Sequence, residues 1–331
     1  MNLTTGWSQW LGTNEQWDVQ QLKLSDPCIY QSSSWAAHRA TFGWKAIRLM
    51  NRSETCFAQI LHRNMYGLTI AWIPGGPTGN LGDINKDLVT EFCRIIKTSR
   101  VYLRLNSLEQ NSQDTEKHLF DNKFHRVKNK LSSGLSLIYA LDKDQIKQRE
   151  NLSSNWGRNL RRGETRNNEP YLWQQIDPAE VTTLYQQLVD YKDLTTSSEV
   201  LNSATINSLI KNCESHLQVF RCDDDLGKPL AIRGALIFGN KAWDIFAAVS
   251  PQGRKQYSSY VTAWALLNHC ALMGLQIYDL SGVDPVKNKG VYDFKHGTGA
   301  TEFQYIGEWD CGTPLIVKSI VGRLMKYRKN L

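Results

Sequence analysis

The sequence predicts an α/β (α+β) protein made of two domains, each a mixed β-sheet flanked by helices. Its 331 residues suit two domains of common size. A content of 41% hydrophobic and 21% charged residues is typical of a globular chain that packs a core. An order of three strands, a helix and a further strand occurs twice along the chain. This repeat lies in the order of the elements and not in the sequence itself.

The first half is expected to begin with a short helix and to continue with the repeated unit. Serines at 32–34 can cap that helix, and Gly43 ends it. The segment PGGP at 74–77 demands a turn at the end of a strand. The expected elements are a helix at 35–42, strands at 44–50, 56–63 and 67–77, a helix at 87–100 and a strand at 101–106.

The second half repeats this order after a strand at 135–142. A basic amphipathic helix at 316–330 is expected to pack back on the first half. We therefore expect a first domain at 1–148 plus 310–331 and a second domain at 149–309. The remaining expected elements are helices at 177–194 and 203–215, strands at 217–223, 229–240 and 241–250, a loop at 251–259, a helix at 260–274 and a strand at 277–282.

The charge of the chain favours an anionic partner. The formal net charge is +7 and the pI is near 8.9. Nucleic acid, a nucleotide phosphate and anionic lipid headgroups are all compatible with this balance.

The cysteines and the hydropathy pattern indicate a cytoplasmic protein. The seven cysteines are an odd number, widely spread and without a CxxC pair, which argues against a disulfide framework or a zinc site. The N-terminus has no signal-peptide pattern, and no run of about 18 apolar residues occurs. We therefore expect membrane contact that is at most peripheral.

Several common catalytic motifs are missing from the sequence. It has no GxSxG, HExxH or GxxxxGK[ST] motif, and no GxGxxG follows a strand. The histidines are scattered, and His38, His269 and His296 are expected to be structural. We therefore expect neither a metal site nor nucleotide-triphosphate chemistry.

Three basic segments could carry chemistry instead. The segment 151–168 holds four arginines, and the loop at 251–259 precedes a helix whose free N–H groups could bind an anion together with Arg254 and Lys255. The segment 277–299 combines lysines with glycines and contains the pair Phe294-Lys295. A lysine in a dry cleft can stabilise the oxyanion of acyl transfer. From the residues alone, a solvated loop and ordinary surface lysines remain equally open. The four arginines are Arg158, Arg161, Arg162 and Arg166.

Five further segments are spread over nearly the whole length of the chain: QSSSWAAHRATFGWKAIRL, AWIPGGP, SSNWGRNLRRGE, PQGRKQYSSYVTAWALL and IYDLSGVDPVKNKGVYDFKHGTGATEFQYIGEWD. Together they resemble the Fem family of peptidoglycan bridge-forming transferases. The most specific is the last, whose pattern YDxxGVDP…GVYxFKxG…YxGEWD is typical of that family. The chain lacks a coiled-coil arm and is similar to the short, FemX-like form.

This resemblance implies two acetyltransferase-like (GNAT-type) domains and a specific reaction. An amino acid carried on tRNA would be transferred to an amine of the peptidoglycan stem peptide, in UDP-MurNAc-pentapeptide or lipid II, by direct aminolysis. The resemblance implies no cofactor and no metal, with aminoacyl-tRNA as co-substrate. We expect the protein to act as a monomer.

The resemblance also assigns residues to the acceptor. Arg39 stands where the family has a basic residue on the nucleotide diphosphate, and Arg233 is the candidate for a second contact. Tyr102 and Asn106 fall on the strand at 101–106, where family members often have an Asp near the acceptor amine.

Other residues are assigned to the donor and to the transition state. Tyr257 and Tyr260 match tyrosines that line the substrate channel. Phe294 and Lys295 match the pair that supports the transition state, with Lys295 on the oxyanion. The basic residues expected to contact tRNA phosphates are Arg158, Arg161, Arg162, Arg254 and Lys255.

Two positions depart from the family pattern. Asn106 cannot act as a base, so the tRNA ribose hydroxyl or a water is the expected proton acceptor. Thr298 replaces an aromatic residue in the pattern FKxGFG, which would alter the shape near the acceptor. The alternatives are an acyl-CoA-dependent N-acyltransferase acting on an amino sugar or amino acid, and a non-catalytic binding protein on the same fold.

Overall fold

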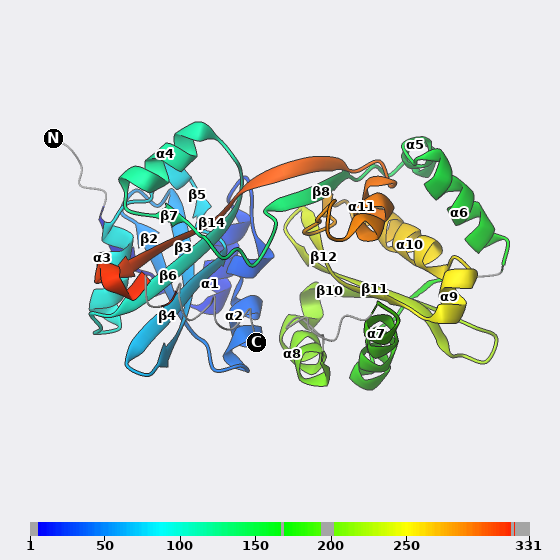
Figure 1. Ribbon diagram of the computed structural model, residues 1–331, viewed down its shortest axis with the longest axis horizontal. Helices are drawn as coiled ribbons and strands as arrows, with labels where there is room; N and C mark the ends of the chain where they lie inside the picture. Colours follow the sequence, from blue (N-terminus) through cyan, green and yellow to red (C-terminus); the bar gives the residue numbers. More distant parts are fainter. Residues whose placement is uncertain (1–5, 167–168, 193–201, 319–320, 322–331) are drawn as a thin grey trace. The chain divides into compact units, whose positions relative to one another are not determined.

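A computed structural model describes residues 6–166, 169–192, 202–318 and 321 (Figure 1). Its contacts divide the chain into unit 1, which is Met1–Leu135 with Gln304–Leu331, and unit 2, which is Ser136–Phe303. The sequence had placed the divisions at 148/149 and 309/310. In the structure they fall within two strands, β8 (Leu135–Ala140) and β14 (Thr301–Thr313), and not in loops.

Unit 1 contains a mixed sheet with the strand order β1-β2-β3-β4-β6-β14. Neighbouring strands are antiparallel except β4 and β6, which are parallel and are joined through helix α3. The short strands β5 (Thr78–Gly79) and β7 (His125–Arg126) pair with β3 and β14. The main strands are β1 (Trp7–Gln9), β2 (Lys45–Asn51), β3 (Cys56–Met65), β4 (Leu68–Gly75) and β6 (Val101–Gln110).

Helices cover both faces of this sheet. From α3 (Asp87–Ile95) and α4 (Gln113–Asp121), Phe92 and Leu119 join a core cluster with Ala58 of β3. Successive residues of a strand point to opposite faces, so Phe57 lies on the other side of β3. There Trp17 packs edge-on against Phe57, with ring centroids 6.1 Å apart. The helices of this second face are α1 (Asn14–Leu22), the 3₁₀ turn Ile29–Gln31 and α2 (Ser33–Ala40).

Unit 2 contains a sheet with the order β9-β10-β11-β12-β13-β8. Its strands are antiparallel except β12 and β13, which are parallel and are joined through α9 and α10. This is the same arrangement as β4 and β6 in unit 1. The strands are β9 (Tyr171–Leu172), β10 (Leu217–Asp223), β11 (Pro229–Phe238), β12 (Lys241–Val249) and β13 (Ile277–Asp279).

The helices of unit 2 also lie on both sides of its sheet. Figure 1 shows α7 and α8 on one side and α10 on the other, where α6 packs against α10. The helices are α5 (Gln145–Glu150), α6 (Ser154–Glu164), α7 (Pro178–Lys192), α8 (Ser203–Cys213), α9 (Pro251–Lys255), α10 (Ser258–Leu272) and α11 (Lys289–His296).

The predicted α/β class and the repeated order of three strands, a helix and a strand are confirmed. Several segments expected as loops or left without a structure are helical, among them 154–164, 251–255 and 289–296. The predicted helix at 316–330 lies mostly outside the described residues. Within them, residues 315–318 and 321 are helical. Every helix in the described ranges is too short or too polar to cross a lipid bilayer.

Candidate active site

Lys295 is a buried lysine in the last turn of α11, with 9% of its surface exposed. Its Nζ lies 3.4 Å from the carbonyl oxygens of Ser281 and Gly282 and 4.0 Å from Asp244 Oδ2. Burial lowers the pKa of Lys295, and the nearby Asp244 carboxylate opposes that shift. The predicted Lys-rich loop is thus a helix that carries its last lysine into the interior.

Asp244, on β12, is the carboxylate that organises this interior. Both of its side-chain oxygens accept a hydrogen bond of 2.8 Å from Arg233, one from Nε and one from Nη2. Its Oδ1 also accepts a hydrogen bond of 3.2 Å from the Tyr278 hydroxyl. Its main-chain oxygen accepts a bond of 2.6 Å from Ser281 Oγ, which fixes the turn beside Lys295. Sequence reasoning missed Asp244, because a single Asp in a strand carries no spacing signal.

Arg233, which was predicted to contact a diphosphate, is almost completely buried. It is 6% exposed, and two of its three guanidinium nitrogens bind Asp244. Burial acts to lower the pKa of Arg233, but the charge of Asp244 outweighs it and the pKa is raised. The guanidinium also lies over the ring of Phe294, 5.5 Å from its centroid. Only Nη1 is left to reach a ligand without breaking the pair.

Phe294 and the two predicted channel tyrosines belong to one aromatic cluster. Phe294 lies 5.0 Å from Tyr260 and 5.9 Å from Trp156 between ring centroids. Tyr260 lies 6.3 Å from Tyr257, and its hydroxyl accepts a bond of 3.1 Å from Asn159. The structure therefore brings three predicted site residues together: Tyr257 and Tyr260, at the start of α10, and Phe294, on α11. Trp156, on α6, is a member that sequence reasoning left without a role.

The basic residues of α6 and α9 meet around Tyr257. Arg162 Nη1 donates a bond of 3.0 Å to the Tyr257 hydroxyl, and Arg166 donates to the Lys255 carbonyl. Both guanidiniums lie over the Tyr257 ring, at 5.5 and 5.3 Å. The exposed Arg158 and the exposed Arg161, farther along α6, extend this surface; Arg158 is bonded to Asn155 at 2.7 Å. The close approach of α6 to α10 needs Gly163, where an added Cβ would lie 2.8 Å from Val261 Cγ1.

Part of the loop predicted before α10 is itself a short helix. Residues 251–255 form α9, and the Gly253 N–H donates to Ser250 Oγ at 2.9 Å. That N–H is therefore used as a cap and is closed to an anion. Arg254 is half-buried, whereas Lys255 is exposed.

In unit 1, Arg39 lies in an aromatic surround. Its guanidinium is 5.7 Å from Phe42, 5.8 Å from Trp44 and 5.7 Å from Trp72. Arg63 lies over the same Trp44 ring at 4.6 Å. Within the described ranges, neither guanidinium forms an ion pair, and the buried Nε of each has no hydrogen-bond partner. Burial, followed by the charge of Arg63, lowers the pKa of Arg39. Two adjacent cations without an acid can bind an anion; Arg63 was missed from the sequence.

Tyr102 and Asn106 lie on one face of β6 and have different surroundings. Tyr102 is 3% exposed, donates to Asp310 Oδ2 at 3.0 Å and accepts from Arg104 at 2.9 Å. Val317 packs over it, so its side chain has no surface for a ligand here. Burial raises the pKa of Tyr102. Asn106 is half-buried, and its side chain makes no hydrogen bond among the residues the structure describes.

Thr298, the departure from the family pattern, closes the end of α11. It is fully buried, and its hydroxyl donates a bond of 2.7 Å to the Lys295 carbonyl. This contact holds the turn that carries Lys295. In the described part of the chain, no three His, Cys, Asp or Glu side chains are grouped as metal ligands.

Comparisons with known proteins bear on the fold and on the family that the chain resembles. Residues 198–316 match the model of the FemAB family. The crystal structure of FemX is similar over 95% of this chain and 100% of its own, with a TM-score of 0.81 and 14% identity. No curated protein sequence matches.

Two further structures share the fold with lower similarity. One is the C-terminal domain of a putative lysylphosphatidylglycerol synthetase from Agrobacterium fabrum, with a TM-score of 0.56, 13% identity, and coverage of 94% of this chain and 97% of that one. The other is a tandem GNAT protein from the clavulanic acid biosynthesis pathway, with a TM-score of 0.57, 9% identity, and coverage of 93% and 98%. The predicted fold of two acetyltransferase-like units is confirmed. The match over residues 198–316, which include Arg233, Asp244 and Lys295, is a similarity of this part of the chain to the FemAB family.

Proposed function

We propose that this protein is a transferase that moves an amino acid from aminoacyl-tRNA to an amine of a peptidoglycan precursor peptide. The observation that carries the proposal is the buried Lys295, held beside Asp244 inside the segment that matches the FemAB family. The acceptor is proposed to be UDP-MurNAc-pentapeptide or lipid II. The reaction as proposed needs no metal and no organic cofactor.

The chemistry is the aminolysis of an activated ester. The acceptor amine forms a bond to the carbonyl carbon, the bond from that carbon to the tRNA ribose oxygen breaks, and the ribose hydroxyl leaves with a proton. Because the ester is already activated, holding both substrates in place supplies a large part of the catalysis, up to roughly 7–11 kcal/mol. Asn106 has no carboxylate to take the amine proton, so we assign that proton to the ribose hydroxyl or a water.

Lys295 is suited to stabilise the oxyanion that forms during this step. Its two hydrogen bonds to carbonyl oxygens are long, at 3.4 Å each, so little is lost when an N–H turns to a new acceptor. One such donor typically contributes about 2.7–4 kcal/mol to the transition state. Asp244 favours the charged form of Lys295 and keeps Arg233 under the Phe294 ring. Phe294, Tyr260 and Tyr257 would then form one wall of the donor channel.

The remaining cations are assigned to phosphates. Arg39, with Arg63 beside it, is proposed to hold the diphosphate of the acceptor, because both lack an ion pair among the described residues. Arg233 would contribute Nη1 alone. The exposed surface of α6 and α9 is proposed to contact RNA phosphates; its basic residues are Arg158, Arg161, Arg162, Arg254 and Lys255.

One observation weighs against the acyl-CoA alternative. Acetyltransferase-type enzymes hold the pyrophosphate of CoA with main-chain N–H groups of a loop that leads into a helix. Here the Gly253 N–H is already capped by Ser250 Oγ. The alternative nevertheless belongs in the test, because the tandem GNAT protein shares the fold.

The test is a transfer assay with labelled donors and defined acceptors. We expect a set of tRNAs charged with labelled amino acids to give a product heavier by one amino-acid residue with UDP-MurNAc-pentapeptide or lipid II. Acetyl-CoA with the same acceptors, and with amino sugars and amino acids, forms the second arm. Transfer from acetyl-CoA alone would make the protein an acyltransferase, and transfer from neither donor would make it a binding protein.

A pair of variants on α11 separates Lys295 from its neighbours. Lys295→Met should lower kcat about 100-fold or more while leaving the affinity for the acceptor unchanged, because an oxyanion donor acts in the transition state. Lys289→Met is the control: it lies on the same helix, its side chain is 73% exposed, and it pairs only with Asp293 on the surface. Normal turnover of Lys295→Met would remove Lys295 from the mechanism.

A further inference from the structure

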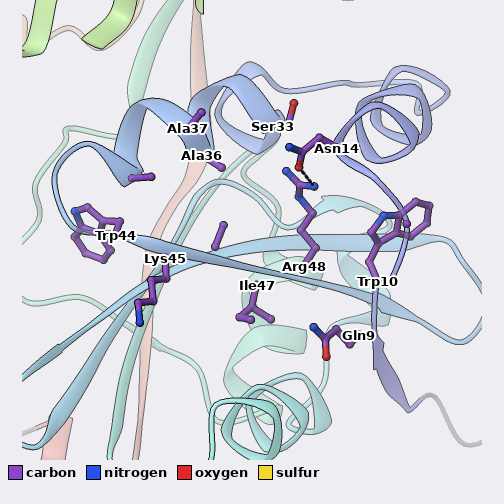
Figure 2. A pocket seen from close by; sticks show the side chains of 13 residues that line it. Gln9, Trp10, Asn14, Ser33, Ala36, Ala37, Trp44, Lys45, Ile47 and Arg48 are labelled. Carbon is purple, nitrogen blue, oxygen red and sulfur yellow. Dashed lines mark hydrogen bonds between the residues drawn. The ribbon is translucent and has the colours of Figure 1, made fainter. Parts of the chain in front are cut away.

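A pocket of about 450 Å³ lies beside β2 in unit 1 (Figure 2). Three segments line it: the stretch 9–14, helix α2 and the stretch 44–48. It shares only Trp44 with the aromatic surround of Arg39, and none of the residues assigned above to catalysis lines it. Its volume is within the usual range of ligand sites, about 300–1,000 Å³.

The pocket contains an open edge of the sheet. β1 pairs with β2 only at Leu49–Asn51, and the Trp10 N–H donates one further bond of 2.9 Å to the Arg48 carbonyl. In an antiparallel ladder, alternate residues direct both main-chain groups toward the same neighbour. Arg48 faces this edge, so Ala46 faces it too. Within the ranges the structure describes, β3 pairs with β2 at Ala46 on one side, and no strand pairs with Ala46 on the β1 side.

The lining residues show that the pocket encloses the edge and not only one face of the strand. In Figure 2, Trp44 and Arg48 project toward α2, whereas Lys45 and Ile47 project to the opposite side of β2. All four line the same pocket. A ligand that fills it therefore lies along the strand and meets side chains on both faces. An extended peptide has this shape, because its own side chains alternate in the same way.

The two faces have different chemistry. On the α2 side, the floor is made of the small residues Ala36, Ala37 and Ala40, between the rings of Trp10 and Trp44. This leaves room for an apolar side chain. The cations Lys45 and Arg48 lie on opposite faces, and neither forms an ion pair within the described residues. Arg48 donates to Asn14 at 2.8 Å and to Gln59 at 2.9 Å, and it lies in the field of the Asp18 and Glu15 carboxylates. Lys45 is therefore the cation that can pair with an acid of a ligand.

We propose that the edge of β2 at Ala46 binds an extended segment of a partner protein as an added strand, in line with β1. The segment would form main-chain hydrogen bonds with Ala46 and carry at least one carboxylate, which pairs with Lys45. Strand addition of this kind gives affinity through the main chain and specificity through alternate side chains. The proposal does not depend on the transferase reaction.

The test first selects peptides that bind the protein and then removes the main-chain N–H of Ala46 by substitution. A displayed library of random decapeptides is selected against the full chain, and the binders are synthesised and titrated. Ala46→Pro should weaken their binding about tenfold or more, because it deletes the N–H that faces the edge. Proline is tolerated on an edge strand where its nitrogen faces outward, so the variant should fold. Ala46→Ser keeps the N–H and should bind within about twofold.

Two further measurements test whether the selected peptides bind at the edge of β2. Lys45→Glu should weaken acidic binders about fivefold and favour basic ones, because Lys45 is exposed and acts through its charge. Hydrogen exchange of the Ala46 amide should slow when a peptide binds to the unaltered protein. No selected binder, equal affinity for Ala46→Pro and Ala46→Ser, or an Ala46 amide that stays unprotected would overturn the proposal. If no peptide binder is selected, Lys45 would instead be a charged residue that keeps the exposed edge of β2 from pairing with other strands.

Discussion

At the scale of single residues, Asp244 balances the buried charges of unit 2. The carboxylate is shared between Arg233, at 2.8 Å, and Lys295, at 4.0 Å. Both cations are almost fully removed from water. A cation in such a place is stable only with a compensating charge. The aromatic cluster and the oxyanion donor therefore depend on an acid that touches neither the donor nor the acceptor in the proposed reaction.

Asp244→Asn tests this dependence. The change leaves Arg233 without its bidentate partner, so we expect a loss of about 3–5 kcal/mol in the free energy of unfolding. The pKa of Lys295 should fall further, because burial would act on it with less opposition. Urea unfolding measures the first effect. Asp293→Asn is the matched control, since that carboxylate is 53% exposed and should cost under about 1 kcal/mol. Equal stability of the two variants would contradict the role given to Asp244.

The lowered pKa of Lys295 predicts a pH dependence of stability with a definite sign. In the unfolded chain the lysine titrates near its ordinary value of about 10.4. Between the lowered native pKa and that value, the unfolded state binds more protons, so stability rises with pH in this window. The free energy of unfolding of the wild type should therefore improve relative to Lys295→Met as the pH rises from the lowered native pKa of Lys295 toward about 10.4. A difference in the free energy of unfolding between the two proteins that does not change with pH would show that burial does not lower the pKa of Lys295.

At the scale of elements, the helices that position the site were the hardest to predict. Strands β2, β3, β4 and β6, and helices α3, α7, α8 and α10, follow clear periodic patterns and were expected near their observed places. Helices α9 and α11 have five and eight residues, too few for a periodic signal. Helix α6 contains two glycines, which disfavour a helix, and a dense set of arginines, which leaves few apolar residues to give a helical pattern. Contacts with α10 decide that it is a helix.

The two glycines of α6 predict opposite effects of one substitution. At Gly157, an added Cβ would meet only Leu152 at 3.9 Å, so Gly157→Ala should stabilise the protein by about 0.5–1 kcal/mol through helix propensity. At Gly163, the Cβ would lie 2.8 Å from Val261 Cγ1 and 3.1 Å from the Tyr257 carbonyl. Gly163→Ala should therefore cost about 1–3 kcal/mol. Thermal unfolding of both variants checks this; a shift of the same sign in both would mean that α6 does not pack closely on α10.

At the scale of the whole molecule, the two units use one strand arrangement but complete it from different parts of the chain. In unit 1, β6 pairs with β14, a strand that comes nearly 200 residues later in the sequence. In unit 2, β13 pairs with β8, a strand that comes before all the other strands of that sheet in the sequence. Local patterns predict a strand but not a partner 208 residues away, such as Asp310 for Tyr102. For this reason the predicted domain limits differ from the unit limits of the structure, and the burial of Tyr102 was not predicted. Phe294, Tyr257 and Tyr260 were each named from the family resemblance, and the structure adds that their rings lie together.

The net charge of +7 would attract any polyanion. A test of tRNA binding must therefore compare the removal of positive charges from α6 with the removal of the same charge from another part of the surface. Each phosphate contact that is removed lowers the slope of log K against log[salt] by roughly 0.7–0.9. Arg158→Ala with Arg161→Ala on α6 should therefore weaken binding of charged tRNA at low salt and reduce the slope by about 1.4–1.8. Lys117→Ala with Lys211→Ala removes the same charge from exposed positions on α4 and α8. Filter binding over a range of salt concentrations measures both slopes. If the two double variants lose the same slope, the attraction belongs to the net charge of the molecule, and α6 is not the RNA-binding surface.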